Sequence, residues 1–147
     1  MFRGNHPTRV DEKGRLKVPA EFKRLIDEKY GAQFYITSVD GNAALIYPME
    51  EWERIEEKLA RLSSFNPTKK KFLNRTNYNG QMVEIDGQGR LLIPSLLRDK
   101  AQIKGEVAVL GQLKYLEVRN EEALRTEIEE EPFTTEDDKT LDELLGG

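Results

Sequence analysis

The chain of 147 residues contains no cysteine and a single histidine, His6. The absence of cysteine excludes a disulfide framework and a thiolate metal site, and it fits a reducing cytoplasm. A lone histidine near a terminus, followed by Pro7, has no partner for nucleophilic chemistry, so we interpret it as a surface or packing residue. We therefore expect no enzyme activity, no cofactor and no metal.

Long apolar runs are also missing. No stretch approaches the roughly 20 apolar residues of a membrane-spanning helix, and the first residues, MFRGNHP, lack the apolar segment of a secretory signal. The GQG at residues 87–89 lacks the spaced glycines and the Lys-Ser/Thr pair of a phosphate-binding loop. These features predict a cytoplasmic protein with no membrane partner and no small-molecule substrate.

An excess of positive charge is missing too, since the net charge of −4 argues mildly against a nucleic-acid partner. The charges are unevenly distributed, however. Residues 1–24 contain seven Lys/Arg and three Asp/Glu, whereas residues 117–147 contain three and twelve. Because salt screens exposed charges beyond roughly 8 to 10 Å, a basic N-terminal face can act while the acidic tail stays distant.

The chain does contain a duplication. Repeat one begins with VDEKGRLKVP (residues 10–19), and repeat two begins 75 residues later with IDGQGRLLIP (residues 85–94). After each block the chain continues with a helical segment and two strand-like runs, at residues 33–37 and 44–48 in repeat one and 106–110 and 115–119 in repeat two. Because each repeat alone has too few strands to bury its apolar face, we expect the two to share one small barrel.

Each block predicts two strands joined by a tight turn. The glycine closes the turn with a positive φ, the aspartate accepts N–H groups of the turn, and an arginine follows the aspartate by four residues. Alternation places Leu16 and Val18 on one face of the strand and Arg15 and Lys17 on the other. The Asp–Arg pair then has two interpretations: it braces the turn, or it presents the arginine to a nucleic acid.

The outward positions differ between the repeats. Their formal charges sum to +3 in repeat one and to −1 in repeat two. The outward positions are Arg9, Asp11, Lys13, Arg15 and Lys17, aligned with Glu84, Asp86, Gln88, Arg90 and Leu92. A two-stranded ribbon fits the major groove of DNA, where arginine binds guanine through two hydrogen bonds. Repeat one is therefore the better candidate DNA-binding face, and we expect repeat two to support the fold or to contact neighbouring subunits.

The start MFRGN and the blocks DEKGRLKVPAEF and DGQGRLLIPSLLR resemble the MraZ family of bacterial transcriptional regulators, in order and over nearly the whole chain. The resemblance implies a strand-rich α+β fold in which two fused, pseudo-symmetric swapped-hairpin modules of the AbrB/antitoxin type form a small double-psi-type barrel with peripheral helices. It also implies ring-shaped homo-oligomers, located at the nucleoid. These would bind double-stranded DNA at repeated sites upstream of the division and cell-wall gene cluster.

The doubled motif carries over as two pairs, Asp11 with Arg15 and Asp86 with Arg90. Charge and strand phase add four further candidate DNA contacts: Arg3, Arg9, Lys13 and Lys17. We expect a first module with its closing helix at residues 1–64, a linker at 65–76, a second module with its helix at 77–130, and an acidic tail at 131–147. The linker is basic, with Lys69, Lys70, Lys71 and Arg75, and is interpreted as solvated or as a source of non-specific phosphate contacts.

The tail supports an alternative function. Swapped-hairpin modules also occur in antitoxins, so the chain could be a protein-binding module whose acidic tail engages a partner. That alternative requires the apolar residues of a loose tail to be exposed; they are Phe133, Leu141, Leu144 and Leu145.

Overall fold

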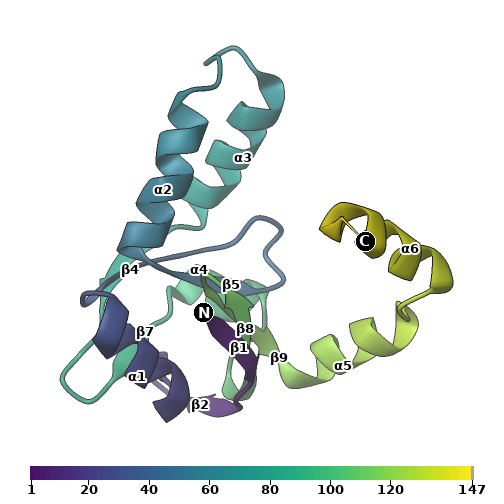
Figure 1. Cartoon of the computed structure of the whole chain (residues 1–147). Helices are drawn as coiled ribbons and strands as arrows, with labels where there is room; N and C mark the ends of the chain where they lie inside the picture. The colour runs from purple at the N-terminus through teal and green to yellow at the C-terminus, as the bar shows by residue number, and fades with distance from the viewer. Residues whose placement is uncertain (147) are drawn as a thin grey trace.

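The computed structural model describes residues 1–146, which form a strand barrel with helices around it (Figure 1). The strands are β1 (Phe2–Asn5), β2 (Thr8–Val10), β3 (Arg15–Lys17), β4 (Gln33–Thr37), β5 (Ala44–Pro48), β6 (Gln81–Glu84), β7 (Arg90–Leu92), β8 (Gly105–Leu113) and β9 (Leu116–Asn120). The helices are α1 (Ala20–Lys29), α2 (Met49–Ala60), α3 (Pro67–Tyr78), α4 (Ser95–Lys100), α5 (Glu121–Glu130) and α6 (Thr135–Leu145). No helix within residues 1–146 has the length and apolar character to cross a membrane.

The strand order reveals how the repeats combine. The antiparallel sheet runs β6-β4-β5-β9-β8-β2-β3-β7, and β1 pairs with β8 outside this path. The N–H of Asp86 donates to the carbonyl of Arg90, so the turn between β6 and β7 brings the two ends of the sheet together. Exchanging each strand for its counterpart in the other repeat gives the same circular order. The repeats are therefore interleaved in one barrel, which confirms the predicted α+β double-psi-type fold.

The pairing of β3 with β7 lies at the local twofold axis. Leu16 stands opposite Leu91, and both side chains are completely buried. Beyond this pair, the N–H of Val18 donates to the carbonyl of Gly89, and the N–H of Ile93 donates to the carbonyl of Gly14, each at 2.9 Å. Each turn is thus held by the strand end of the other repeat, as expected for swapped hairpins.

The core confirms the predicted alternation along the strands. Leu16 and Val18 are buried, whereas Lys17 is exposed and Arg15 is partly exposed. The buried apolar residues come from both repeats and include Phe2, Val10, Leu16, Phe22, Ile26, Phe34, Ile36, Ile46, Leu91, Ile93, Leu97, Ile103, Val107, Val109, Leu116 and Val118. Burying one such large side chain contributes about 1.5–3 kcal/mol. Since each repeat supplies only part of this set, neither repeat could form the core alone.

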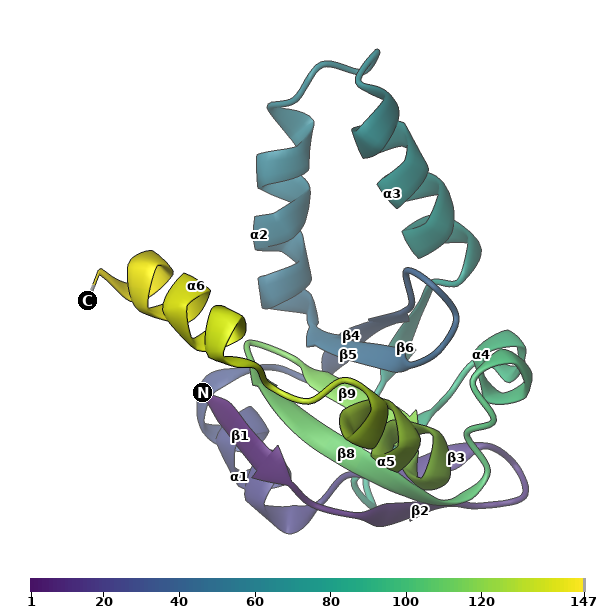
Figure 2. The ribbon, with the colours of Figure 1, turned by 90° about the vertical axis from the view of Figure 1, so that its right-hand side faces the viewer.

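Helices α2 and α3 form a hairpin that projects from the barrel (Figure 2). At its base Trp52 is buried and stacks on Tyr35 of β4, with ring centroids 4.8 Å apart, and on Phe72 of α3. Among the large apolar residues of α2, Trp52 is buried, whereas Met49, Ile55 and Leu59 are partly exposed. Farther out, Leu62 is about half exposed and Phe65 at the tip is 95% exposed, because the hairpin extends beyond the core.

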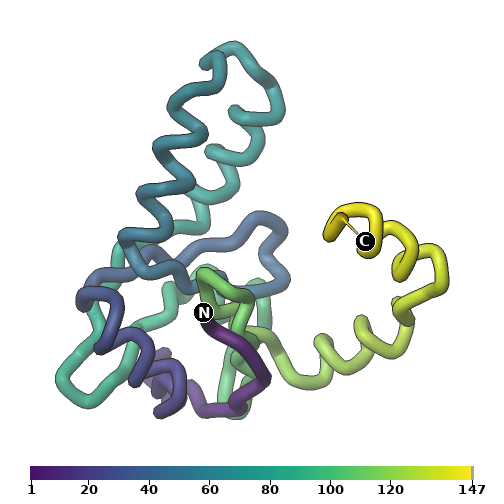
Figure 3. The backbone as a smooth tube through the Cα atoms, viewed as in Figure 1, coloured from purple at the N-terminus to yellow at the C-terminus, as the bar shows by residue number. Residues whose placement is uncertain are grey.

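Two segments differ from the sequence-based expectation. Most of the expected linker is helix α3, because Asn66 caps its start by accepting the N–H groups of Thr68 and Lys69, and Pro67 occupies the first turn. Beyond Glu130, where the acidic sequence suggested a looser end and left its order open, α6 is a helix with a capping box between Thr134 and Asp137. The chain runs from α5 into α6 as an arm that leaves the barrel (Figure 3).

Candidate nucleic-acid interface

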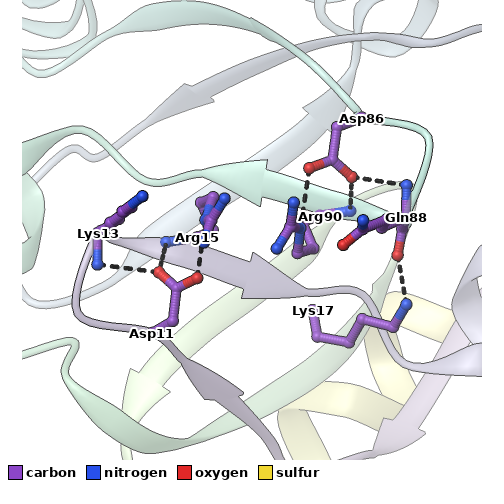
Figure 4. Close-up of polar contacts among 7 residues, drawn as sticks. All are labelled: Asp11, Lys13, Arg15, Lys17, Asp86, Gln88 and Arg90. Atoms are coloured by element: carbon purple, nitrogen blue, oxygen red, sulfur yellow. Dashed lines mark hydrogen bonds and ion pairs between the residues drawn. The ribbon is translucent and has the colours of Figure 1, made fainter.

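Turn one, residues 11–15, is built around the carboxylate of Asp11. Its Oδ1 accepts the backbone N–H groups of Lys13 (3.0 Å) and Arg15 (2.9 Å), and its Oδ2 pairs with Nε of Arg15 at 2.7 Å (Figure 4). Gly14 closes the turn with φ +87°. The aspartate thereby fixes both the turn and the direction of the arginine side chain.

Turn two, residues 86–90, repeats this geometry. Oδ1 of Asp86 accepts the N–H groups of Gln88 and Arg90, both at 2.9 Å, and Oδ2 pairs with Nε of Arg90 at 2.9 Å (Figure 4). In both pairs the aspartate engages Nε, and within residues 1–146 the structure shows no hydrogen bond from the Nη atoms of Arg15 or Arg90. The Nη edge of each guanidinium is thus left for another acceptor.

The two aspartates stay charged because their surroundings favour the carboxylate. The N–H of Arg15 is the main cause that lowers the pKa of Asp11 from its usual 3.8, and the guanidinium of Arg15 adds to it. The N–H and guanidinium of Arg90 lower the pKa of Asp86 in the same way. Each Asp–Arg pair therefore remains ionised at neutral pH, with the carboxylate orienting the cation.

Repeat two contributes its arginine to the same face as repeat one. In the β3–β7 pair, Arg15 stands opposite Leu92, and Lys17 stands opposite Arg90. Directly opposed residues share one face of a sheet, and diagonal neighbours lie about 7–8 Å apart, which applies to Arg15 and Arg90. Their side chains are 33% and 25% exposed. The sequence favoured repeat one as the DNA-binding face, whereas the β3–β7 pairing brings the arginines of both repeats onto one face.

The other candidate cations are in different situations. The ammonium of Lys17 donates to the carbonyl of Gln88 in turn two, and Nη1 of Arg9 forms an exposed ion pair of 3.2 Å with Glu106. Lys13 is exposed on turn one.

Arg3 lies apart from these cations. It stands opposite Gln112 on β8, whereas Arg9 stands opposite Glu106. Six residues of antiparallel strand span about 20 Å, so Arg3 is not part of the cluster around the turns.

An open groove of about 730 Å³ runs beside turn one. Six basic and two acidic side chains line it; they are Arg9, Arg15, Lys17, Arg90, Arg98, Lys104, Asp11 and Glu12. We call this surface the basic groove. Its positive charge contrasts with the net charge of the chain, so the surface that presents the two oriented arginines is also locally attractive to an anion.

Sequence reasoning missed Arg98 and Lys104 in this groove. Nε of Arg98 donates to the carbonyl of Ile93 at 3.0 Å, and its guanidinium lies so close to turn one that a Cβ on Gly14 would be 2.4 Å from Cζ. The aligned residue of repeat one is Lys23, 75 residues earlier; its Cε would lie 3.7 Å from a Cβ on Gly89 of turn two, a looser approach than that of Arg98 to Gly14. Lys23 pairs with Asp27 at 2.7 Å, whereas Arg98 has no acidic partner within residues 1–146.

Comparison with known proteins identifies a family that shares this sequence along nearly its whole length. The model of the family described as "MraZ protein, putative antitoxin-like" matches residues 1–75 and 79–144. Proteins named "Transcriptional regulator MraZ" are 66% identical over 145 residues in Koribacter versatilis and 62% identical over 144 residues in Acidobacterium capsulatum; each match covers 98% of this chain and 99% of the relative. The relative of that name in Nitrosospira multiformis is 38% identical over 129 residues, which is 88% of each chain. With its doubled Asp–Arg turns and a match along almost all of its length, the chain belongs to the MraZ family.

Proposed function

We propose that this protein is a transcriptional regulator that binds double-stranded DNA sequence-specifically through the basic groove and catalyses no reaction. The observation that carries the proposal is the pair of arginines on one outward face, each held through Nε by an aspartate, with the Nη edges open. The names of the relatives point to the same function, since they are called transcriptional regulators.

The two turns suit base recognition. A two-stranded ribbon enters the major groove, and the guanidinium of an arginine binds O6 and N7 of guanine in a bidentate manner. Because Asp11 and Asp86 already orient Arg15 and Arg90, little side-chain freedom remains to be lost on binding. The neighbouring cations would neutralise phosphates and set the register on the duplex; they are Arg9, Lys13, Lys17, Arg98 and Lys104.

One groove with a few cations would bind DNA weakly. We propose that several subunits assemble into a ring, so that repeated promoter sites bind several grooves at once and the effective concentration multiplies the affinity. The proposed sites lie upstream of the division and cell-wall gene cluster, which implies a cytoplasmic protein at the nucleoid. The alternative, an antitoxin-like module that binds a partner through its tail, is favoured only by the exposed leucines of α6.

The deciding experiment is DNA binding by Arg15→Ala on promoter DNA containing the repeats, measured across a salt series. Loss of one bidentate base contact should weaken specific binding by about 1–3 kcal/mol, which is roughly 5- to 150-fold, while the oligomer persists. Arg125→Ala is a matched control, because Arg125 is an exposed arginine of α5 that pairs with Glu121, outside the groove. Arg3→Ala tests whether β1 adds a phosphate contact.

Arg90→Ala separates the two repeats. If both arginines read bases, the two variants should lose specific binding to a similar extent, and the steep salt dependence of phosphate contact should remain. Normal DNA binding by Arg15→Ala would refute the assignment of this face. Indifference of the unaltered protein to DNA at every salt concentration would favour the partner-binding alternative instead.

A further inference from the structure

Helix α6 presents an apolar stripe that nothing in its own chain covers. Leu141, Leu144 and Leu145 follow the i, i+3, i+4 spacing of one helix face, and every residue of α6 is exposed. An isolated helix of this length is only marginally stable in water. A helix with defined caps and an open leucine stripe is therefore a surface built for a partner.

The arm that carries α6 reaches away from the barrel. Helix α5 is anchored through buried Leu124 and through the ion pair of Glu127 with Arg119, and all residues from Glu129 to Gly146 are exposed. At 1.5 Å per residue α6 alone extends the arm by roughly 16 Å. Figures 1 and 2 show that the α5–α6 arm and the α2–α3 hairpin leave the barrel separately.

The hairpin offers a surface that complements α6. Helix α3 contains four basic residues and no acidic residue, and α6 contains five acidic residues and one lysine, so their formal charges are +4 and −4. At the hairpin tip Leu62 and Phe65 are exposed, which provides an apolar contact for the leucine stripe. The basic groove is lined by other residues, so the α3 face is separate from the proposed DNA-binding surface.

We propose that α6 of one subunit docks on α3 and the hairpin tip of a second copy of this chain. The acidic side chains of α6 would face Lys70, Lys71 and Arg75, and the leucine stripe would cover Leu62 and Phe65. Each subunit has one arm and one hairpin, so the contact is heterologous and propagates from subunit to subunit, and it forms the proposed ring where the rotation between subunits closes. This inference rests on the self-association in the proposed function and specifies the contact that holds it.

Because the chain has no cysteine, paired cysteine substitutions test the contact directly. Leu144→Cys and Phe65→Cys are placed in two differently tagged full-length chains, which are mixed and oxidised. A disulfide-linked heterodimer should form several-fold faster than with Leu113→Cys as the acceptor, because Leu113 is also exposed, at 59% against 95% for Phe65, but lies at the β8–β9 turn. A rate no higher than that of the Leu113 control would overturn the inference.

Charge reversal gives an independent test with the same readout. Lys70→Glu with Lys71→Glu should lower the yield of the heterodimer several-fold, Asp138→Lys with Asp142→Lys should do the same, and mixing the two reversed surfaces should restore it. Glu53→Lys with Glu57→Lys is the control, because it changes exposed charges on α2 of the same hairpin. If reversing the charges of Lys70 and Lys71 weakens DNA binding but leaves the cross-linking intact, α3 is a phosphate contact and the docking is refuted.

Light scattering on the unaltered protein separates the two levels of the hypothesis. A monomer would refute both the proposed self-association and this contact. An oligomer that gives no enhanced link between Leu144→Cys and Phe65→Cys chains would refute only the contact, and ring assembly would then require another interface.

Discussion

Turn one should be less tolerant of a side chain at its glycine than turn two. Gly14 and Gly89 have φ values of +87° and +75°, so alanine at either position is strained by about 1–2 kcal/mol. At Gly14 the new Cβ would also lie 2.4 Å from Cζ of Arg98, whereas at Gly89 the nearest atom is 3.5 Å away. Displacing Arg98 breaks its hydrogen bond to Ile93, a loss of about 0.5–1.5 kcal/mol.

We therefore expect Gly14→Ala to lower the free energy of unfolding by about 2–3 kcal/mol and Gly89→Ala by about 1–2 kcal/mol. For a chain of this size the difference of about 1 kcal/mol corresponds to roughly 3–5 °C in Tm. Denaturant unfolding at one fixed protein concentration measures it, since oligomers gain stability with concentration.

The Arg98→Ala background provides the decisive comparison, as in a double-mutant cycle. Without the guanidinium, the two glycine substitutions should destabilise the protein equally. The reasoning fails if the two single variants are equally destabilised when Arg98 is present, or if their difference persists when it is absent.

Three further outcomes are expected. Because the pKa values of Asp11 and Asp86 are lowered, the contribution of these carboxylates to stability is complete above about pH 4 and is lost as the pH falls through the folded-state pKa. Carboxyl NMR titration should find both pKa values below 3.8, and values at or above 3.8 would contradict the turn geometry. Trp52→Ala removes a buried indole that is 4% exposed and should lower unfolding stability by about 3–5 kcal/mol in chemical denaturation. Asn66→Ala removes the α3 cap and should reduce stability by about 1 kcal/mol without changing DNA affinity in a gel shift.

Much of the fold follows from patterns within short stretches of sequence. The duplicated block predicted two glycine-closed turns, and the alternation of apolar and polar residues predicted which side of β3 faces the core. The aspartate acceptors of both turns were likewise expected from residue type and spacing. These predictions succeeded because turn chemistry and strand alternation depend on neighbours a few residues apart.

The misses have two physical origins. The starts of α3 and α6 carried the ordinary signals, Asn66 before Pro67 and Thr134 three residues before Asp137, but their charged, weakly apolar sequences looked like solvated connections. Non-local pairing caused the other misses. That Arg90 shares a face with Arg15, and that Arg98 lies against turn one, depends on β3 pairing with β7 across some 75 residues of chain.

The alternation of hairpins around the barrel has a consequence for synthesis on the ribosome. Hairpins β2–β3 and β4–β5 of repeat one are each flanked by strands of repeat two. At about 5–20 residues per second, the strand edges of repeat one therefore wait roughly 4–15 s for their partners to be made. A nascent chain of this architecture stays open to mispairing until most of the polypeptide has emerged, so its folding is post-translational in character although it is short.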